Sequence, residues 1–261
     1  MGTRVCDCSH GNKIIVVIIQ TAVHVILVIK LRTITFLFPK NSFPRYSRKN
    51  MPCAGIQSDY VEKIGVSGLI AVGKTTLAID ISETLGSRIQ KEPVEKNPFL
   101  QDFYTDKKKY SFPAQISFLN ARYKQYCENK NSRESIVYDR TLFEDFVFAD
   151  CLHEEGNMSG REFDTYKGLY DILCSNLEKP SYLIYLDTSP DICMERLLTR
   201  NRTLEFGCDG VSLEYLQALE RAYQRFLVEF SKHTPVFKVN WNDYGDTKQL
   251  LARINEIRNG D

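Results

Sequence analysis

Residues 62–76 read Glu-Lys-Ile-Gly-Val-Ser-Gly-Leu-Ile-Ala-Val-Gly-Lys-Thr-Thr, and this stretch decides the fold. An apolar run predicts a strand over Glu62–Ser67, and a helical pattern follows over Lys74–Leu85. Residues 68–75 run from the end of this strand into the helix and satisfy GxxxxGK[ST]. In this pattern, backbone amides at a helix N-terminus cradle phosphate oxygens. The sequence therefore predicts a binding site for the phosphates of ATP or GTP. The residues expected to surround these phosphates are Gly68, Leu69, Ile70, Ala71, Val72, Gly73, Lys74, Thr75 and Thr76.

A magnesium ion is expected beside this loop. Lys74 would reach the outer phosphates, and the Thr75 hydroxyl would bind the metal. A carboxylate near the metal is also needed, and two candidates end apolar strands: Asp139 after Ser-Ile-Val-Tyr, and Asp187 after Tyr-Leu-Ile-Tyr-Leu. The pattern alone does not choose between them.

Short apolar runs alternate with helical periodicity along the rest of the chain, which predicts an α/β fold with a parallel sheet of about five strands flanked by helices. The expected strands are Glu62–Ser67, Arg88–Lys91, Ser135–Tyr138, Tyr182–Leu186 and Val236–Val239. The expected helices are Lys74–Leu85, Pro113–Asn129, Leu142–Glu155, Gly160–Glu178, Pro190–Arg200, Leu213–His233 and Thr247–Arg258.

Charge divides the 261 residues into an N-terminal extension, 1–58, and a body, 59–261. The extension carries eight Lys or Arg and one acid, Asp7, which leaves 26 basic and 32 acidic residues in the body. An acidic body argues against nucleic acid as the main partner.

The extension is open to four interpretations: a membrane anchor, a secretory signal, an organelle presequence, or upstream sequence that adds nothing to the fold. Its apolar run, Ile14–Ile29, is short for a membrane span. Secretion is disfavoured because sequons at Asn157 and Asn201 would meet the glycosylation machinery. We therefore expect a cytoplasmic or mitochondrial protein, with membrane contact only if the extension anchors it. Met51 is a candidate start of the working protein.

The eight cysteines show no CxxC spacing, and no paired histidines accompany them. A zinc site or a disulfide framework is therefore not expected. Scattered thiols in a reducing compartment are the better interpretation.

Three further features indicate phosphoryl transfer. Glu92 follows the second strand, where a carboxylate can accept the proton of an attacking hydroxyl. Arg140 follows Asp139 at the end of the third strand, and a guanidinium there suits a phosphoryl oxygen. An arginine-rich segment, with Arg196, Arg200 and Arg202, predicts a lid over the transferring phosphate.

Together these motifs resemble the deoxynucleoside kinase family, which includes deoxycytidine, deoxyguanosine and deoxyadenosine kinases. The resemblance runs from about Lys63 to Arg258 and implies a P-loop kinase fold, ATP and Mg²⁺ as cofactors, and a homodimer. It is carried by the phosphate loop, Glu92-Pro93-Val94, Asn97-Pro98-Phe99-Leu100, Phe103-Tyr104, Gln115, Phe118-Leu119, Arg122, Asp139-Arg140-Thr141, Glu144-Asp145 and Arg196 through Glu205.

The resemblance implies a role for each matching residue. Glu92 is implied as the general base for the 5′-hydroxyl, and Tyr104 with Glu205 as the pair that holds the 3′-hydroxyl. Arg140 would bridge the substrate hydroxyl and the phosphate. The resemblance further implies that Arg196, Arg200 and Arg202 form the lid. It also implies that Asp139 rather than Asp187 binds magnesium, and that adenine lies beside Asp243 and Tyr244.

Recognition of the base is predicted at three polar residues. The Gln115 amide offers one donor and one acceptor, which suits the edge of adenine or cytosine. Arg122 and Asp145 resemble the pair that accompanies purine or cytosine preference in the family. Relatives usually place an aromatic directly before the glutamine, whereas this chain has Ala114. The aromatic residues that would compensate are Phe112, Phe118 and Phe148.

The leading hypothesis is an ATP- and Mg²⁺-dependent salvage kinase that phosphorylates the 5′-hydroxyl of a purine deoxynucleoside or of deoxycytidine. One alternative is a nucleoside monophosphate kinase of thymidylate-kinase type, against which Glu92 argues because its charge would repel a phosphorylated acceptor. The other is a non-catalytic kinase-like subunit, against which the intact Lys74, Thr75, Asp139 and Arg140 argue.

Overall fold

The computed structural model describes residues 35–37, 61–200 and 210–259. The chain divides into two compact units, Met1–Thr35 and Phe36–Asp261, and the second carries the fold. Apart from the strand β1, the predicted extension over residues 1–58 lies outside the described residues.

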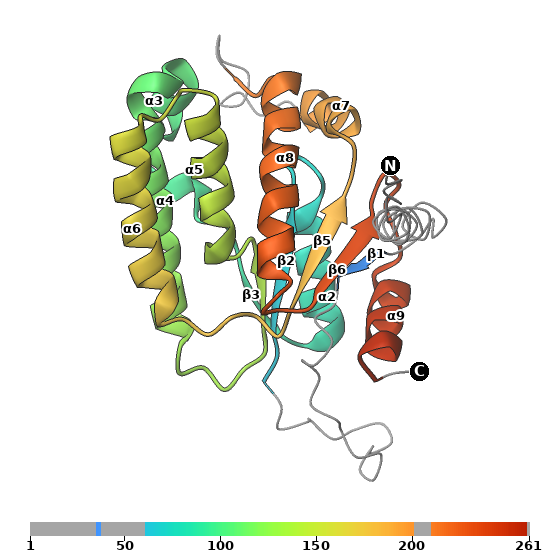
Figure 1. Ribbon diagram of the computed structural model, residues 1–261. Helices are drawn as coiled ribbons and strands as arrows, with labels where there is room; N and C mark the ends of the chain where they lie inside the picture. The colour runs from blue at the N-terminus through green and yellow to red at the C-terminus, as the bar shows by residue number, and fades with distance from the viewer. Residues whose placement is uncertain (1–34, 38–60, 201–209, 260–261) are drawn as a thin grey trace, which may run out of the picture. The chain divides into compact units, whose positions relative to one another are not determined.

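Five parallel strands form the centre of the fold, as predicted, in the order β6-β5-β2-β4-β3 (Figure 1). β2 is flanked by β4 and β5, and β1 stands next to β6 in the strand order. The strands are β1 (Thr35–Leu37), β2 (Lys63–Gly68), β3 (Arg88–Gln90), β4 (Ile136–Asp139), β5 (Tyr182–Asp187) and β6 (Val236–Asn240).

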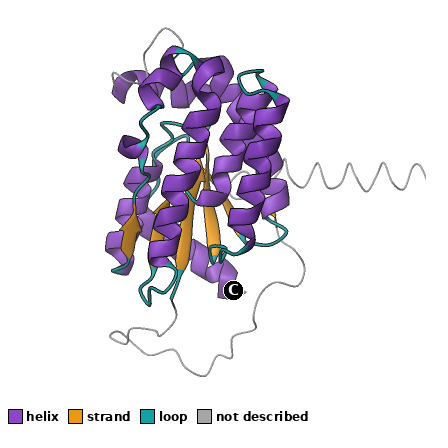
Figure 2. Ribbon diagram, turned by 90° about the vertical axis from the view of Figure 1, so that its left-hand side faces the viewer, coloured by secondary structure: helices purple, strands orange, loops and turns teal. Residues whose placement is uncertain are grey.

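Helices cover both faces of this sheet (Figures 1 and 2). α2 packs on β2, β3 and β4, and α9 packs on α2. On the other face Tyr126 of α4 stacks on Tyr138 of β4, and Tyr223 of α8 packs against Tyr185 of β5. The helices are α2 (Lys74–Leu85), α3 (Leu100–Thr105), α4 (Lys107–Asn129), α5 (Asp145–Glu154), α6 (Gly160–Ser175), α7 (Pro190–Arg200), α8 (Leu213–Phe230) and α9 (Thr247–Asn259), with 3₁₀ turns η1 (Val94–Lys96) and η2 (Leu142–Glu144).

Four helical predictions were wrong in their bounds, and two of them, Gly160–Glu178 and Leu213–His233, each ran three residues past the observed ends of α6 and α8. The prediction began α4 at Pro113, but the helix begins at Lys107, where the Asp106 side chain accepts a hydrogen bond from the Lys109 amide and caps the first turn. The predicted helix Leu142–Glu155 is split into η2 and α5. The short helix α3, between Asn97 and α4, was not predicted.

The carboxyl ends of β2, β3 and β4 meet at one edge of the sheet. The chain adds β3 and β4 on one side of β2 and then β5 and β6 on the other side. The strand order therefore reverses beside β2. Open parallel sheets bind ligands at such a reversal. The phosphate loop after β2 therefore lies beside the residues that follow β3 and β4.

Other predictions concern cysteines and membranes. The cysteines within the described residues, Cys127, Cys151, Cys174 and Cys193, are free thiols. Within the same residues, no helix is long and apolar enough to cross a membrane.

Candidate active site

The phosphate loop has the backbone that its glycines allow. Gly68 has a φ of +143°, and a Cβ there would lie 2.9 Å from the backbone oxygen of Leu186. Gly73 has a φ of +108° at the start of α2. Lys74 is buried, and its Nζ donates to the Leu69 carbonyl at 2.6 Å. Burial, together with the charge of Arg140, lowers the pKa of Lys74 to about 7.

Thr75 and Asp139 meet at the first turn of α2. The Thr75 hydroxyl donates to Asp139 Oδ2 at 2.6 Å, and Asp139 Oδ1 is buried without a hydrogen-bond partner among the described residues. Asp187 differs, because its carboxylate is partly exposed and lies 3.2 Å from the Lys238 ammonium. An unpaired carboxylate oxygen beside a hydroxyl fits an oxygen-coordinated cation such as Mg²⁺.

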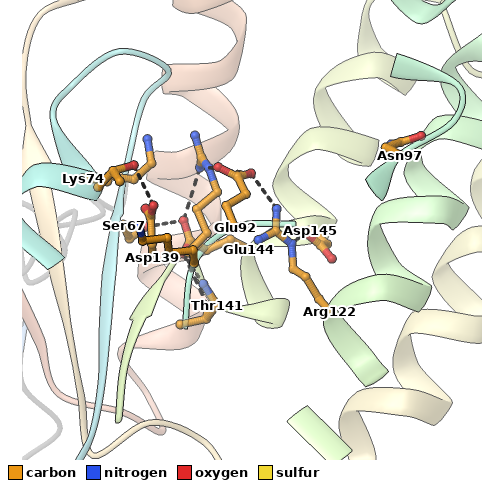
Figure 3. A network of polar contacts seen from close by, with 12 residues as sticks. Ser67, Lys74, Glu92, Asn97, Arg122, Asp139, Thr141, Glu144 and Asp145 are labelled. Atoms are coloured by element: carbon orange, nitrogen blue, oxygen red, sulfur yellow. Dashed lines mark hydrogen bonds and ion pairs between the residues drawn. The ribbon is translucent and has the colours of Figure 1, made fainter. Parts of the chain in front are cut away.

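Glu92 lies between two guanidinium groups (Figure 3). Arg122 Nη2 donates to Glu92 Oε1 at 2.7 Å, and Arg140 Nε lies 3.3 Å from the carboxylate. Burial alone would raise the pKa of Glu92. The positive charges of Arg140, Arg122 and Lys74 outweigh it and lower the pKa to about 2.

Of the three residues predicted to recognise the base, Arg122 contacts this carboxylate and Asp145 contacts Arg122. Arg122 Nε donates to Asp145 Oδ1 at 2.6 Å, while Asp145 Oδ2 is buried and has no hydrogen-bond partner within the described residues. Gln115 stands two turns before Arg122 on α4 and is also buried. Its amide makes no hydrogen bond to another described residue, which leaves its donor and acceptor for a ligand.

A second buried network lies behind Arg140. Glu144, which is fully buried, accepts hydrogen bonds from the Ser67 hydroxyl at 2.6 Å, the Thr141 amide at 2.8 Å and the Tyr223 hydroxyl at 3.0 Å. Arg140 Nη1 donates to the same Tyr223 hydroxyl. Sequence reasoning assigned no role to Ser67, Glu144 or Tyr223. Tyr223 in particular lies 83 residues after Arg140, and no local motif connects the two.

Arg196 contacts backbone oxygens of two loops. It donates to the Val72 carbonyl at 3.1 Å and to the Trp241 and Asn242 carbonyls at 3.0 and 2.7 Å, and its guanidinium lies 4.3 Å from the ring centre of Tyr244. This arrangement joins the phosphate loop to the segment after β6.

Of the other residues predicted for the lid and for adenine binding, some lie within the described residues and some outside them. Arg200 ends α7, and Asp243 and Tyr244 lie in the turn before α9, where Tyr244 is exposed. Arg202 and Glu205 lie outside the described residues.

Tyr104 and the predicted aromatic substitutes are all partly buried. Tyr104 lies on α3, which is held near α4 because the Asn97 side chain donates to the Ala114 carbonyl at 3.0 Å. Phe118 lies under Arg122 and Phe148 under Arg140, with guanidinium-to-ring distances of 5.8 and 4.8 Å. Phe112 packs against the core. Phe118 and Phe148 therefore lie against the two arginines that contact Glu92.

Comparison with known proteins places this site in a family. The family model described as "Deoxynucleoside kinase" matches residues 64–258. The chain belongs to the deoxynucleoside kinase family. The match runs from β2 into α9 and includes each of the described site residues discussed above.

Several relatives of this kinase family are similar over most of their length. The chain is 42% identical over 191 residues to a deoxyadenosine kinase of Dictyostelium discoideum, a match that covers 73% of this chain and 77% of the relative. It is 32% identical over 203 residues to a deoxyguanosine kinase of the same organism, covering 76% and 70%. The structure of a deoxyadenosine kinase from M. mycoides with bound dATP matches with a TM-score of 0.66 and 32% identity, covering 75% of this chain and 98% of that one.

Proposed function

We propose that this protein transfers the γ-phosphate of ATP to the 5′-hydroxyl of a deoxynucleoside, with deoxyadenosine as the preferred acceptor and deoxyguanosine and deoxycytidine as further acceptors. The observation that carries the proposal is the position of Glu92, a carboxylate held between Arg122 and Arg140 at the edge of the sheet that bears the phosphate loop. The 42% identity to a deoxyadenosine kinase supports the choice of acceptor.

In this mechanism the phosphate loop holds the donor, and Lys74 neutralises its outer phosphates. Thr75 and Asp139 would hold Mg²⁺, which supplies positive charge to the β- and γ-phosphate oxygens when bound. Glu92 accepts the proton of the 5′-hydroxyl, and Arg140 orients that hydroxyl against the phosphate. Gln115 and Arg122, with Asp145 behind it, read the base edge, and Tyr104 and Glu205 hold the 3′-hydroxyl.

Arginine supplies the remaining charge stabilisation in the proposal. Arg200 and Arg202 close over the transferring phosphate, and Arg196 joins them from the end of α7. Asp243 and Tyr244 lie beside adenine of the donor, which is consistent with the contact of Tyr244 with Arg196 and thereby with the phosphate loop.

The test is ATP-dependent phosphorylation of the four natural deoxynucleosides by the full chain, with Glu92→Gln and Lys74→Met measured in parallel. We expect transfer to deoxyadenosine, loss of turnover in both variants, and retained deoxynucleoside binding in Lys74→Met. Transfer to deoxynucleoside monophosphates instead would point to a nucleoside monophosphate kinase. ATP binding without transfer to either class would point to a non-catalytic subunit.

We also propose that the protein works as a homodimer in the cytoplasm or the mitochondrion. Helix α6 exposes two apolar side chains one turn apart, Leu169 and Ile172, the second of them 67% exposed. Analytical ultracentrifugation of the wild type and Ile172→Glu tests the oligomeric state, with a shift from dimer to monomer expected in the variant. A C-terminal fluorescent fusion of the full chain tests the compartment.

A further inference from the structure

The Tyr223 side chain forms hydrogen bonds to Arg140, which is predicted to act in catalysis, and to the buried carboxylate of Glu144. The side chain is fully buried on α8, an element that carries none of the residues predicted to act in catalysis. Its hydroxyl accepts a hydrogen bond from Arg140 Nη1 and donates one to Glu144 Oε2 at 3.0 Å. The phenol oxygen therefore bridges a guanidinium and a carboxylate whose own ion pair is 3.6 Å long.

Glu144 is fixed independently of Tyr223. Ser67 at the end of β2 and the amide of Thr141 each donate to its carboxylate, so the acid cannot move toward Arg140 without breaking these bonds. Its Oε2 lies 3.6 Å from Arg140 Nη1, which is too long for a hydrogen bond. Coulomb attraction over this distance inside a protein nevertheless draws the guanidinium toward Glu144.

Few interactions hold the Arg140 side chain in its present position. Its backbone has a φ of +65°, a conformation that non-glycine residues adopt at a cost. Its Nε reaches Glu92 at 3.3 Å, and its flat face lies on the ring of Phe148. Nη2 makes no hydrogen bond to any other described residue and is thus available to a ligand.

We infer that Tyr223 is a positioning residue for phosphoryl transfer: its hydroxyl keeps the Arg140 guanidinium beside Glu92 and prevents a closer approach to Glu144, with which Arg140 already forms an ion pair at 3.6 Å. The inference rests on the proposed function, because it gives Arg140 and Glu92 their roles at the 5′-hydroxyl. Without the phenol oxygen, Nη1 has no acceptor except Glu144, and the guanidinium turns away from the general base.

The test compares Tyr223→Phe with Tyr182→Phe in the full chain. Tyr182 is an equally buried tyrosine, but it pairs with Ile64 at the amino end of the sheet, far along the strand from the site. We expect Tyr223→Phe to lower kcat about 10- to 100-fold, as small misplacements of reacting groups do, with the KM for ATP within about twofold of wild type. Tyr182→Phe is expected to keep kcat within about twofold.

A pH profile separates positioning from a general loss of stability. The charged groups facing Glu92 are Arg122 from α4, Arg140 from the end of β4 and Lys74 from α2. Withdrawal of Arg140 moves the acid limb of kcat/KM to higher pH in Tyr223→Phe. Neutralising Glu144 as well, in Tyr223→Phe with Glu144→Gln, removes the attraction and is expected to recover part of kcat.

A crystal structure of Tyr223→Phe tests the inference without relying on turnover. Arg140 Nη1 is expected to move from 3.6 Å to hydrogen-bond distance of Glu144, and the guanidinium is expected to leave Glu92. If Arg140 still contacts Glu92, or if kcat and the acid limb match those of wild type, the inference is wrong. If the wild type phosphorylates no deoxynucleoside, the proposed function fails, while the position of Arg140 in the variant still decides the geometric claim. Glu144→Gln alone serves as the second variant should Tyr223→Phe not fold: with the charge of Glu144 removed, Arg140 is expected to stay beside Glu92, and its departure from Glu92 would contradict the inference.

Discussion

The Arg122 guanidinium binds the Glu92 carboxylate, with Nη2 and Oε1 2.7 Å apart, while its Nε binds Asp145 at 2.6 Å. One side chain thus joins the proposed general base to a residue proposed to recognise the nucleobase. A carboxylate clamped in this way is a weak base, and its pKa is about 2. A nucleobase that takes a hydrogen bond from Arg122 would loosen the clamp and make Glu92 more basic when the correct substrate is bound.

Replacing Arg122 with Met should therefore change the pH dependence of the reaction. Removing one of the two guanidinium groups raises the pKa of Glu92, so the acid limb of kcat/KM moves to higher pH. The measurement is kcat/KM for deoxyadenosine from pH 4 to 8. Asp145→Asn is the matched control, since it leaves Arg122 beside Glu92. An acid limb that shifts equally in both variants would contradict the explanation.

Stability should also depend on Glu92 as the solution is acidified. Its pKa is lowered from 4.5 to about 2 in the folded protein, so the folded state favours the ionised carboxylate. The stability that ionised Glu92 contributes is therefore fully present above about pH 4.5 and is lost as the pH falls toward 2. The difference in free energy of unfolding between wild type and Glu92→Gln should shrink from pH 6 to pH 3 in urea titrations. A constant difference over this range would show that the carboxylate is not held by its arginines.

The hydrogen bond between Thr75 and Asp139 leads to a prediction about the Mg²⁺ dependence of the reaction. Thr75→Val keeps the shape of the side chain but removes the hydroxyl that donates to Asp139, and Thr75→Ser keeps the hydroxyl. We expect Thr75→Val to raise the concentration of free Mg²⁺ needed for half-maximal kcat by about tenfold or more. Thr75→Ser should lie close to wild type. Equal Mg²⁺ dependence in all three proteins would place the metal elsewhere.

Much of the fold was predictable because its signals are local. The apolar runs of β2 and β5 and the phosphate loop each depend on residues adjacent in sequence, and the five parallel strands follow from them. The predicted start of α4 at Pro113 is wrong because Asp106 caps the helix at Lys107, so that Pro113 lies inside the helix and not at its first position, where proline is usually found.

The site was predictable only where a motif marks it. Lys74, Glu92 and Arg140 follow strand ends, which is a pattern visible in sequence. The roles of Ser67 and Tyr223 depend on a single carboxylate, Glu144, that contacts both across the fold. Nothing in the spacing of these residues indicates that contact, because it arises from the packing of α8 on the sheet.

The backbone of the phosphate loop gives a last prediction, in which Gly68→Ala is compared with Gly86→Ala. Both glycines have a positive φ, but a Cβ at Gly68 would lie 2.9 Å from the backbone oxygen of Leu186, whereas a Cβ at Gly86 meets nothing within 4 Å. Gly86→Ala should cost about 1 kcal/mol of stability from backbone conformation alone. Gly68→Ala should cost about 1–3 kcal/mol in addition, since a backbone oxygen of the central sheet cannot move aside easily. It should also weaken ATP binding, because the loop must shift to relieve the contact. Urea unfolding and ATP titration of both variants measure the two effects, and equal losses of stability would show that the loop relaxes without strain.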